Sequence, residues 1–157
     1  MGETLKVLRV TAGGRRFALD AGLVRGVERP GRRVRLPGAP AYVRGVVEVQ
    51  GSVVVVVDLA RRLGLAPDDS ADDVDDIERA VVVIDSSEPV GLAVDDPGDV
   101  IALDPSTLIE LGPAGAAAGL RGLTPDGVVL LEVEPVVDGR ALAPAGPVLD
   151  QLLAARP

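Results

Sequence analysis

Short runs of β-branched residues, each bounded by a turn signal, recur along the whole chain. Runs of valine, with leucine in the last of them, occupy positions 53–57, 81–83 and 128–131. Because β-branched side chains fit a pleated sheet and lose rotamer freedom in a helix, these runs predict strands that are buried on both faces. Turn dipeptides stand between the runs, at Gly13-Gly14, Pro30-Gly31, Pro37-Gly38, Gly51-Ser52, Pro97-Gly98 and Asp126-Gly127.

This pattern predicts an all-β protein with few helices. The ten expected strands cover 5–11, 15–20, 24–29, 44–50, 52–58, 79–85, 89–95, 99–104, 120–124 and 127–133. Short helical turns are expected at 59–63 and near 39–43. Residues 147–155 are expected to form a C-terminal helix, because the large apolar residues that follow Pro147 share one helix face and proline suits a first helical turn.

The order of motifs in the first half of the chain recurs in the second half. Arg44-Gly45-Val46 precedes a turn and a valine strand, and Arg121-Gly122-Leu123 does the same 77 residues later. Each half therefore supplies five strands in one order, and five short twisted strands can close into a small barrel. We expect one domain, 1–157, divided into a first barrel at 5–65, an acidic linker at 66–78, a second barrel at 79–142 and the helix at 147–155, with interleaved chain ends.

The composition excludes most of the common types of catalytic site. The 157 residues include no cysteine and no histidine, which excludes disulfides, thiolate metal sites, thiol nucleophiles and the usual general base at neutral pH. We therefore expect no enzymatic activity, no cofactor and no metal site. The rival hypothesis makes Asp95, Asp96 and Asp99 an acid–base set, which requires these carboxylates to line a deep cleft; carboxylates at a strand end are more often turn formers.

Charge is distributed unevenly along the chain. The net charge is −8, yet residues 1–65 hold twelve cations against five acids, and residues 66–78 hold seven acids and no cation. Such asymmetry can orient a protein on a charged partner. Five arginines surround one turn: Arg25, Arg29, Arg32, Arg33 and Arg35. They favour an acidic protein partner, because aromatic residues for base stacking are almost absent, and nucleic-acid binding stays open as an alternative.

The chain also lacks the features of a membrane or secreted protein. No apolar stretch approaches the ~18 residues that a membrane span needs. The first residues lack the apolar centre of a signal peptide. A cytoplasmic location is the expectation.

An ordered series of motifs resembles the CheW-like family of chemotaxis coupling proteins over about residues 5–153. The strongest piece is 36–46, which is similar to the family pattern LPxxPxxVxGV. The other pieces are Phe17-Ala18-Leu19-Asp20, then Gly51 with Val57-Asp58-Leu59, then Val90-Gly91-Leu92-Ala93-Val94-Asp95, Leu120-Arg121-Gly122, and 126–133. No single piece is specific, but their order and spacing together are.

The resemblance implies two five-stranded SH3-like β-barrels and a non-catalytic adaptor. Proteins of this family bind the cytoplasmic tip of methyl-accepting receptors and the regulatory domain of the CheA-type histidine kinase, which has the same fold. The implied location is the cytoplasm, at receptor arrays, and other CheW-like proteins are possible further partners. The output implied is control of motility.

The resemblance also assigns receptor- and kinase-binding positions, in a valine-lined groove between the barrels that suits one face of a receptor helix. Gly45 and Gly91 are expected to permit close approach, since they carry no side chain. For each valine, plain core packing is the alternative. The positions are Val24, Gly26, Val27, Gly45, Val46, Gln50, Gly51, Gly91, Pro97 and Val100.

Four departures from the family pattern lie near these positions. Gly26 and Gln50 stand where a glutamate and an arginine are usual, so an ion pair expected beside the receptor site is absent; Val55 replaces a proline and Pro97 a valine. On this basis Gln50→Arg alone is expected to add a charge without a partner. The departures leave open an accessory role, in which the protein binds receptors but binds the kinase weakly or not at all, as in gliding-motility systems.

Overall fold

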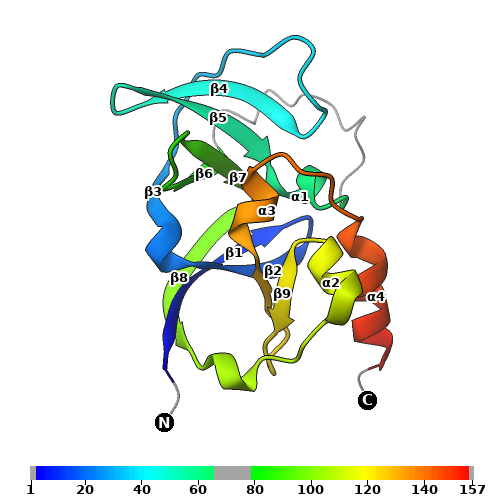
Figure 1. The fold of residues 1–157 in the computed structure, drawn as a ribbon. Helices are drawn as coiled ribbons and strands as arrows, with labels where there is room; N and C mark the ends of the chain where they lie inside the picture. The colour runs from blue at the N-terminus through cyan, green and yellow to red at the C-terminus, as the bar shows by residue number, and fades with distance from the viewer. Residues whose placement is uncertain (1–2, 66–78, 156–157) are drawn as a thin grey trace.

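A computed structural model describes residues 3–65 and 79–155 (Figure 1). The strands are β1 (Leu5–Ala12), β2 (Arg15–Asp20), β3 (Val24–Glu28), β4 (Val43–Val49), β5 (Ser52–Asp58), β6 (Ala80–Ile84), β7 (Val90–Val94), β8 (Asp96–Leu103), β9 (Leu120–Leu123) and β10 (Val129–Leu131). The helices are α1 (Leu59–Arg62), α2 (Gly112–Ala117), α3 (Val133–Val137) and α4 (Ala145–Ala155), with short 3-10 turns η1 (Ala21–Leu23) and η3 (Pro105–Thr107). No helix among these residues is long and apolar enough to cross a membrane.

The all-β prediction is confirmed, and all ten expected strands are present. The largest shifts are at β8, which begins three residues earlier than expected, and at β10, which is shorter at both ends. The helix expected at 147–155 is α4, and the turn expected at 59–63 is α1. The Asp58 side chain starts α1 by accepting a hydrogen bond from the backbone N–H of Arg61.

One local expectation is wrong. The segment near 39–43 forms turns rather than a helical turn, closed by a hydrogen bond from the Val43 N–H to the Pro40 carbonyl. The glycine-rich segment 112–119 contains α2, in which Pro113 occupies the first turn. The acidic linker expected at 66–78 lies outside the described residues.

The strands form two five-stranded sheets with the same internal order. Sheet A runs β8-β1-β2-β10-β9 and sheet B runs β3-β6-β7-β5-β4. Strands whose numbers differ by five occupy the same place in the two sheets, so that β1 corresponds to β6 and β8 to β3. The parallel pair β2–β10 likewise corresponds to the parallel pair β7–β5. The internal repeat in the sequence is thus a repeat in topology.

The sheets nevertheless do not follow the two halves of the chain. Each sheet takes the first two strands of one half and the last three strands of the other half. This exchange goes further than the expected interleaving of chain ends. Strands β1 and β2, from the expected first barrel at 5–65, lie in sheet A, and β6 and β7, from the expected second barrel at 79–142, lie in sheet B. The chain passes between sheets at η1 and at Asp95, the single residue between β7 and β8. Because a hairpin needs about two loop residues, β8 has no room to turn back onto β7 and continues into sheet A.

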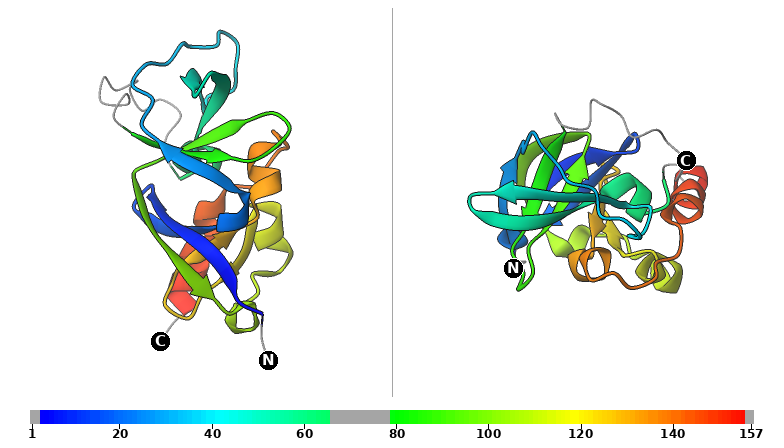
Figure 2. Two further views of the ribbon diagram at one scale, coloured as in Figure 1. Left: turned by 90° about the vertical axis from the view of Figure 1, so that its left-hand side faces the viewer. Right: turned by 90° about the horizontal axis from the view of Figure 1, so that it is seen from above.

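The largest hydrophobic core lies between the two sheets. It combines Phe17 and Leu19 of sheet A with Val82 and Leu92 of sheet B, none of them exposed, and the helices cover it through residues such as Leu149. The interiors of the individual barrels are much smaller clusters. The space between the barrels is therefore packed, rather than an open valine-lined groove. Figure 2 shows the helices gathered on one side of the two sheets.

Arg62 joins the end of α1 to the end of α3. Its buried guanidinium donates hydrogen bonds to the carbonyl oxygens of Pro135 and Val136, each at 2.8 Å, and of Arg140 at 2.5 Å. The guanidinium carbon also lies 4.7 Å from the centroid of the Tyr42 ring. Since carbonyls at a helix C-terminus have no partner within the helix, Arg62 satisfies groups that would otherwise be buried without hydrogen bonds.

We predict that Arg62→Met lowers the free energy of unfolding by about 3 kcal/mol, because it leaves several buried carbonyls unsatisfied. The matched control is Arg121→Met, at an exposed position on β9, where we expect a change within about 0.5 kcal/mol. Urea denaturation followed by circular dichroism measures both. Equal stability of the two variants would contradict a structural role for the Arg62 contacts.

Candidate functional site

Strands β3 and β8 hold half of the ten candidate positions. They are the corresponding terminal strands of the two sheets, and both lie on the left of the molecule in Figure 1, away from α2 and α4. Val24, Gly26 and Val27 are on β3, whereas Pro97 and Val100 are on β8. Gly45, Val46, Gln50 and Gly51 belong to β4 and its turn, and Gly91 to β7.

Only some of these positions present apolar surface. Val27 is 41% exposed and Val100 is 57% exposed, whereas Val24 packs against the core between the sheets. Leu23, in the η1 turn that leads into β3, is 40% exposed and was missed by the sequence analysis. We call Leu23, Val27 and Val100 the apolar edge set. A leucine directly before the expected strand 24–29 was the available signal.

Gly45 does permit a close approach, but the group that approaches it is the protein's own backbone at Val34. Its φ angle is +133°, and an added Cβ would overlap the carbonyl oxygen of Val34. Val34 and Val46 exchange two backbone hydrogen bonds of 2.8 Å, so the loop before β4 docks beside Gly45. The absent side chain thus makes room for this loop, and the close approach at Gly45 is not available to a partner.

Gly91 is buried in the centre of sheet B. An added Cβ would overlap Val81 Cγ1 on β6 and would lie 3.3 Å from Val54 Cγ1 on β5. The expected role of Gly91 as a close-approach position on a binding surface is therefore wrong for a physical reason, since β7 is covered by its neighbours on both sides. Its function is to let valines pack inside the barrel.

Gln50 and Gly51 form the two-residue turn between β4 and β5. Both have positive φ angles, +49° and +82°, which is the geometry of a type I′ hairpin turn. The Gln50 Nε2 amide donates to Glu28 Oε1 on β3 at 3.4 Å. An added Cβ at Gly26 would lie 3.7 Å from the same Glu28 oxygen. The position of Gln50 therefore has a carboxylate neighbour, which is Glu28.

This contact corrects the expectation for Gln50→Arg. Residues i and i+2 of a strand share one face, so Gly26 and Glu28 point the same way, and the alternation of β3 could have revealed Glu28. An arginine at Gln50 would meet Glu28 rather than lack a partner. A glutamate at Gly26 would instead face a second carboxylate.

Pro97 lies where the pairing of β8 with β1 is irregular. It stands opposite Val10, next to the register shift between Leu8 and Val10. Because proline has no N–H to donate, this irregular place on a terminal strand accommodates it without loss of a regular ladder hydrogen bond. The departure from valine at this position is thus compatible with the local backbone.

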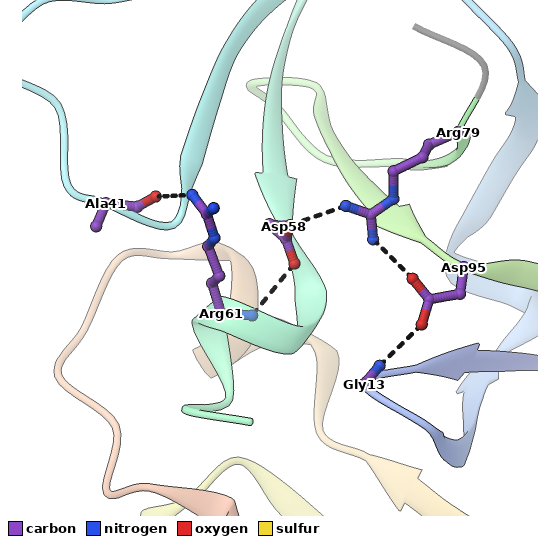
Figure 3. A network of polar contacts seen from close by, with 6 residues as sticks. All are labelled: Gly13, Ala41, Asp58, Arg61, Arg79 and Asp95. Carbon is purple, nitrogen blue, oxygen red and sulfur yellow. Dashed lines mark hydrogen bonds and ion pairs between the residues drawn. The ribbon is translucent and has the colours of Figure 1, made fainter. Parts of the chain in front are cut away.

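Asp95 and Asp99, two of the three carboxylates in the rival enzyme hypothesis, make separate contacts with other residues of the fold. Asp95 accepts from Arg79 Nη2 at 3.1 Å and from the Gly13 N–H at 2.9 Å (Figure 3). Asp99 lies 3.6 Å from Arg9 and is 85% exposed. Among the described residues there is no group of acids arranged to hold a metal ion. Asp95 thus acts as a structural link between the β1–β2 turn and the chain crossing.

The same network ties the crossing to β5. Arg79 Nη1 donates to Asp58 Oδ2 at 2.8 Å, so one guanidinium bridges two aspartates from different parts of the fold (Figure 3). Asp58 also caps α1 through Arg61, whose side chain reaches the Ala41 carbonyl at 3.4 Å. The Val57-Asp58-Leu59 motif, one of the pieces that resemble the family pattern, therefore contributes contacts that hold α1 and Arg79 in place.

Three comparisons bear on the family. The model of the CheW-like domain family matches residues 6–141. Chemotaxis protein CheW of Bacillus subtilis (strain 168) is 34% identical over 64 residues, which are 41% of this chain and 40% of that protein, so the match spans less than half of the relative. The crystal structure of scaffolding protein TtCheW from Thermoanaerobacter tengcongensis has the same fold, with a TM-score of 0.72 and 20% identity over 90% of this chain and 98% of that chain.

For Gly91→Ala we predict a loss of about 1–3 kcal/mol in the free energy of unfolding, because the added methyl overpacks the sheet B interior. Gly26→Ala is the control, since its nearest neighbour is the Glu28 carboxylate at 3.7 Å and no core atom is near. Chemical denaturation midpoints compare the two. A stable Gly91→Ala protein would mean that this position is not packed as described.

A double-mutant cycle tests the contact between Gln50 and Glu28. Gln50→Arg is expected to gain about 0.2–1 kcal/mol from Glu28, and the gain should vanish in Glu28→Gln. Glu110→Gln, an exposed acid elsewhere, is the matched control and should leave the effect of Gln50→Arg unchanged. Strict additivity between positions 28 and 50 in denaturation experiments would place these side chains apart.

Proposed function

The chain belongs to the CheW-like domain family, and from this premise we propose that it acts as a non-catalytic adaptor of a chemosensory array. In this role one CheW-like unit, residues 1–157, couples methyl-accepting receptors to a CheA-type histidine kinase. The proposed location is the cytoplasm, at the receptor arrays.

The observation that carries the receptor arm of the proposal is the apolar edge set. Val27 on β3, Val100 on β8 and Leu23 in the η1 turn that leads into β3 are 40–57% exposed. Exposed apolar side chains that gather on one side of a molecule are typical of interaction surfaces. An amphipathic receptor helix would cover them with its apolar face.

The Glu28–Gln50 contact is close to Val27 in the chain but lies on the other face of β3. Glu28 ends β3, one residue beyond Val27, and Gln50 meets it from the turn between β4 and β5. Because adjacent residues of a strand point to opposite faces, this contact does not border the Val27 side chain. The substitution of glutamine for the usual arginine therefore leaves the apolar edge set unchanged.

A pull-down with three baits separates the adaptor from its alternatives. The baits are a receptor-tip fragment, the kinase regulatory domain and duplex DNA. Capture by the first two supports the adaptor role, whereas capture by the receptor tip alone supports the accessory role that the Gly26, Gln50, Val55 and Pro97 departures suggested. Capture by DNA alone would contradict both and favour a nucleic-acid-binding barrel.

The double variant Val27→Asp/Val100→Asp is predicted to weaken receptor-tip binding by at least about tenfold, since it puts charges where apolar contact is expected. Ile109→Asp is the control: Ile109 is 46% exposed but pairs with Leu123 on β9, at the opposite end of sheet A. Isothermal titration measures both affinities. Equal losses in the two variants would argue against the edge set as the receptor surface.

A further inference from the structure

A second surface lies at a cavity over the interior of the sheet B barrel. Its floor is apolar and includes Val47 and Val56, which belong to the small interior core of that barrel. Four arginines line it, namely Arg32, Arg33, Arg44 and Arg79, and no described residue of its lining carries a carboxylate. We call these four residues the arginine mouth. It includes no residue of the apolar edge set.

Three segments of the fold position the arginine mouth. Arg44 lies on β4 and is only 6% exposed, and Arg79 precedes β6 and is fixed by Asp58 and Asp95. Arg32 and Arg33 lie on the loop before β4. Val34 of this loop is hydrogen-bonded to Val46 of β4, and the loop packs against Gly45, which has no side chain to exclude it. The glycine at 45 therefore has a second consequence, because it brings two loop arginines over the barrel.

We propose that the arginine mouth binds an acidic side chain presented by a protein segment with apolar neighbours. Guanidinium groups bind carboxylates in a planar, two-point geometry, and partial burial strengthens that attraction. The valine floor would contact the apolar atoms beside the carboxylate. Arg33 and Arg44 also make other polar contacts, but a guanidinium has five N–H donors and can serve two acceptors. Arg79 already serves Asp58 and Asp95, so it lines the mouth without being needed as a donor to the bound carboxylate.

Composition favours a peptide over a nucleic acid at this site. Phe17 is fully buried and Tyr42 stacks on Arg62, so these aromatic rings are not presented for base stacking. The net charge of −8 repels an extended polyanion, whereas a single carboxylate feels mainly the local arginines. The proposal is independent of the proposed function, because it concerns other residues and its test contains neither receptor nor kinase.

The test uses the full chain and a fluorescein-labelled peptide of alternating glutamate and leucine. The control is the same peptide with every glutamate replaced by glutamine. Fluorescence anisotropy at low salt should show the glutamate peptide binding at least about tenfold more tightly than the glutamine peptide, and this preference should weaken as salt rises. Duplex DNA, measured in the same buffer, should bind more weakly than the glutamate peptide.

Two double variants of equal charge change locate the site. Arg32→Gln/Arg33→Gln, on the loop, should raise the Kd for the glutamate peptide by about tenfold. Arg25→Gln/Arg121→Gln, at exposed positions outside the mouth, should change it less than about twofold. Equal losses in the two variants, equal binding of the two peptides, or tighter binding of DNA would each overturn the proposal. Circular dichroism confirms that both variants are folded.

Discussion

The hydrophobic core between the two sheets is the interaction on which the rest of this structure depends. Each barrel interior is a small cluster of valines and alanines with a few leucines, whereas the core between the sheets takes in Phe17, Leu19, Val82 and Leu92. Because hydrophobic stabilisation grows with the apolar area removed from water, neither barrel has enough interior to fold well alone. The two sheets are therefore one cooperative unit, and the exchange of strands between halves joins them covalently as well.

Polar contacts stabilise the points where the chain passes from one region to another. Arg79 bridges Asp58 and Asp95 beside the β7–β8 crossing, and Arg62 satisfies carbonyls at the end of α3. Both are buried or half-buried arginines, whose planar donors reach several acceptors at once. The strongly charged sequence thus uses several of its arginines internally, and the surface charge that remains for partners is smaller than the residue count suggests.

Glycines divide into two physical roles. Gly45 and Gly91 make room for neighbouring parts of the protein, a loop carbonyl in one case and valine methyl groups in the other. Gly51, with a φ of +82°, serves the backbone of a tight hairpin. A motif glycine is therefore evidence of local geometry first, and a shared motif does not by itself place a residue on a binding surface. The exposed fraction of the side chain distinguishes a residue on a possible binding surface, such as Val27 or Val100, from a residue with a purely structural role.

The sequence alone determined the strands, the repeat and the family, because valine runs, turn dipeptides and motif order are local signals that survive in the fold. It also shows that the chain contains no cysteine and no histidine. Only the tertiary structure decided that β1 and β2 join β8, β9 and β10, since equivalent strands in the two halves have similar patterns and either pairing satisfies them locally. For the same reason the sequence placed Gly91 on a binding surface and did not single out Glu28. Which residues become neighbours depends on how distant strands pair, and residue type does not encode that.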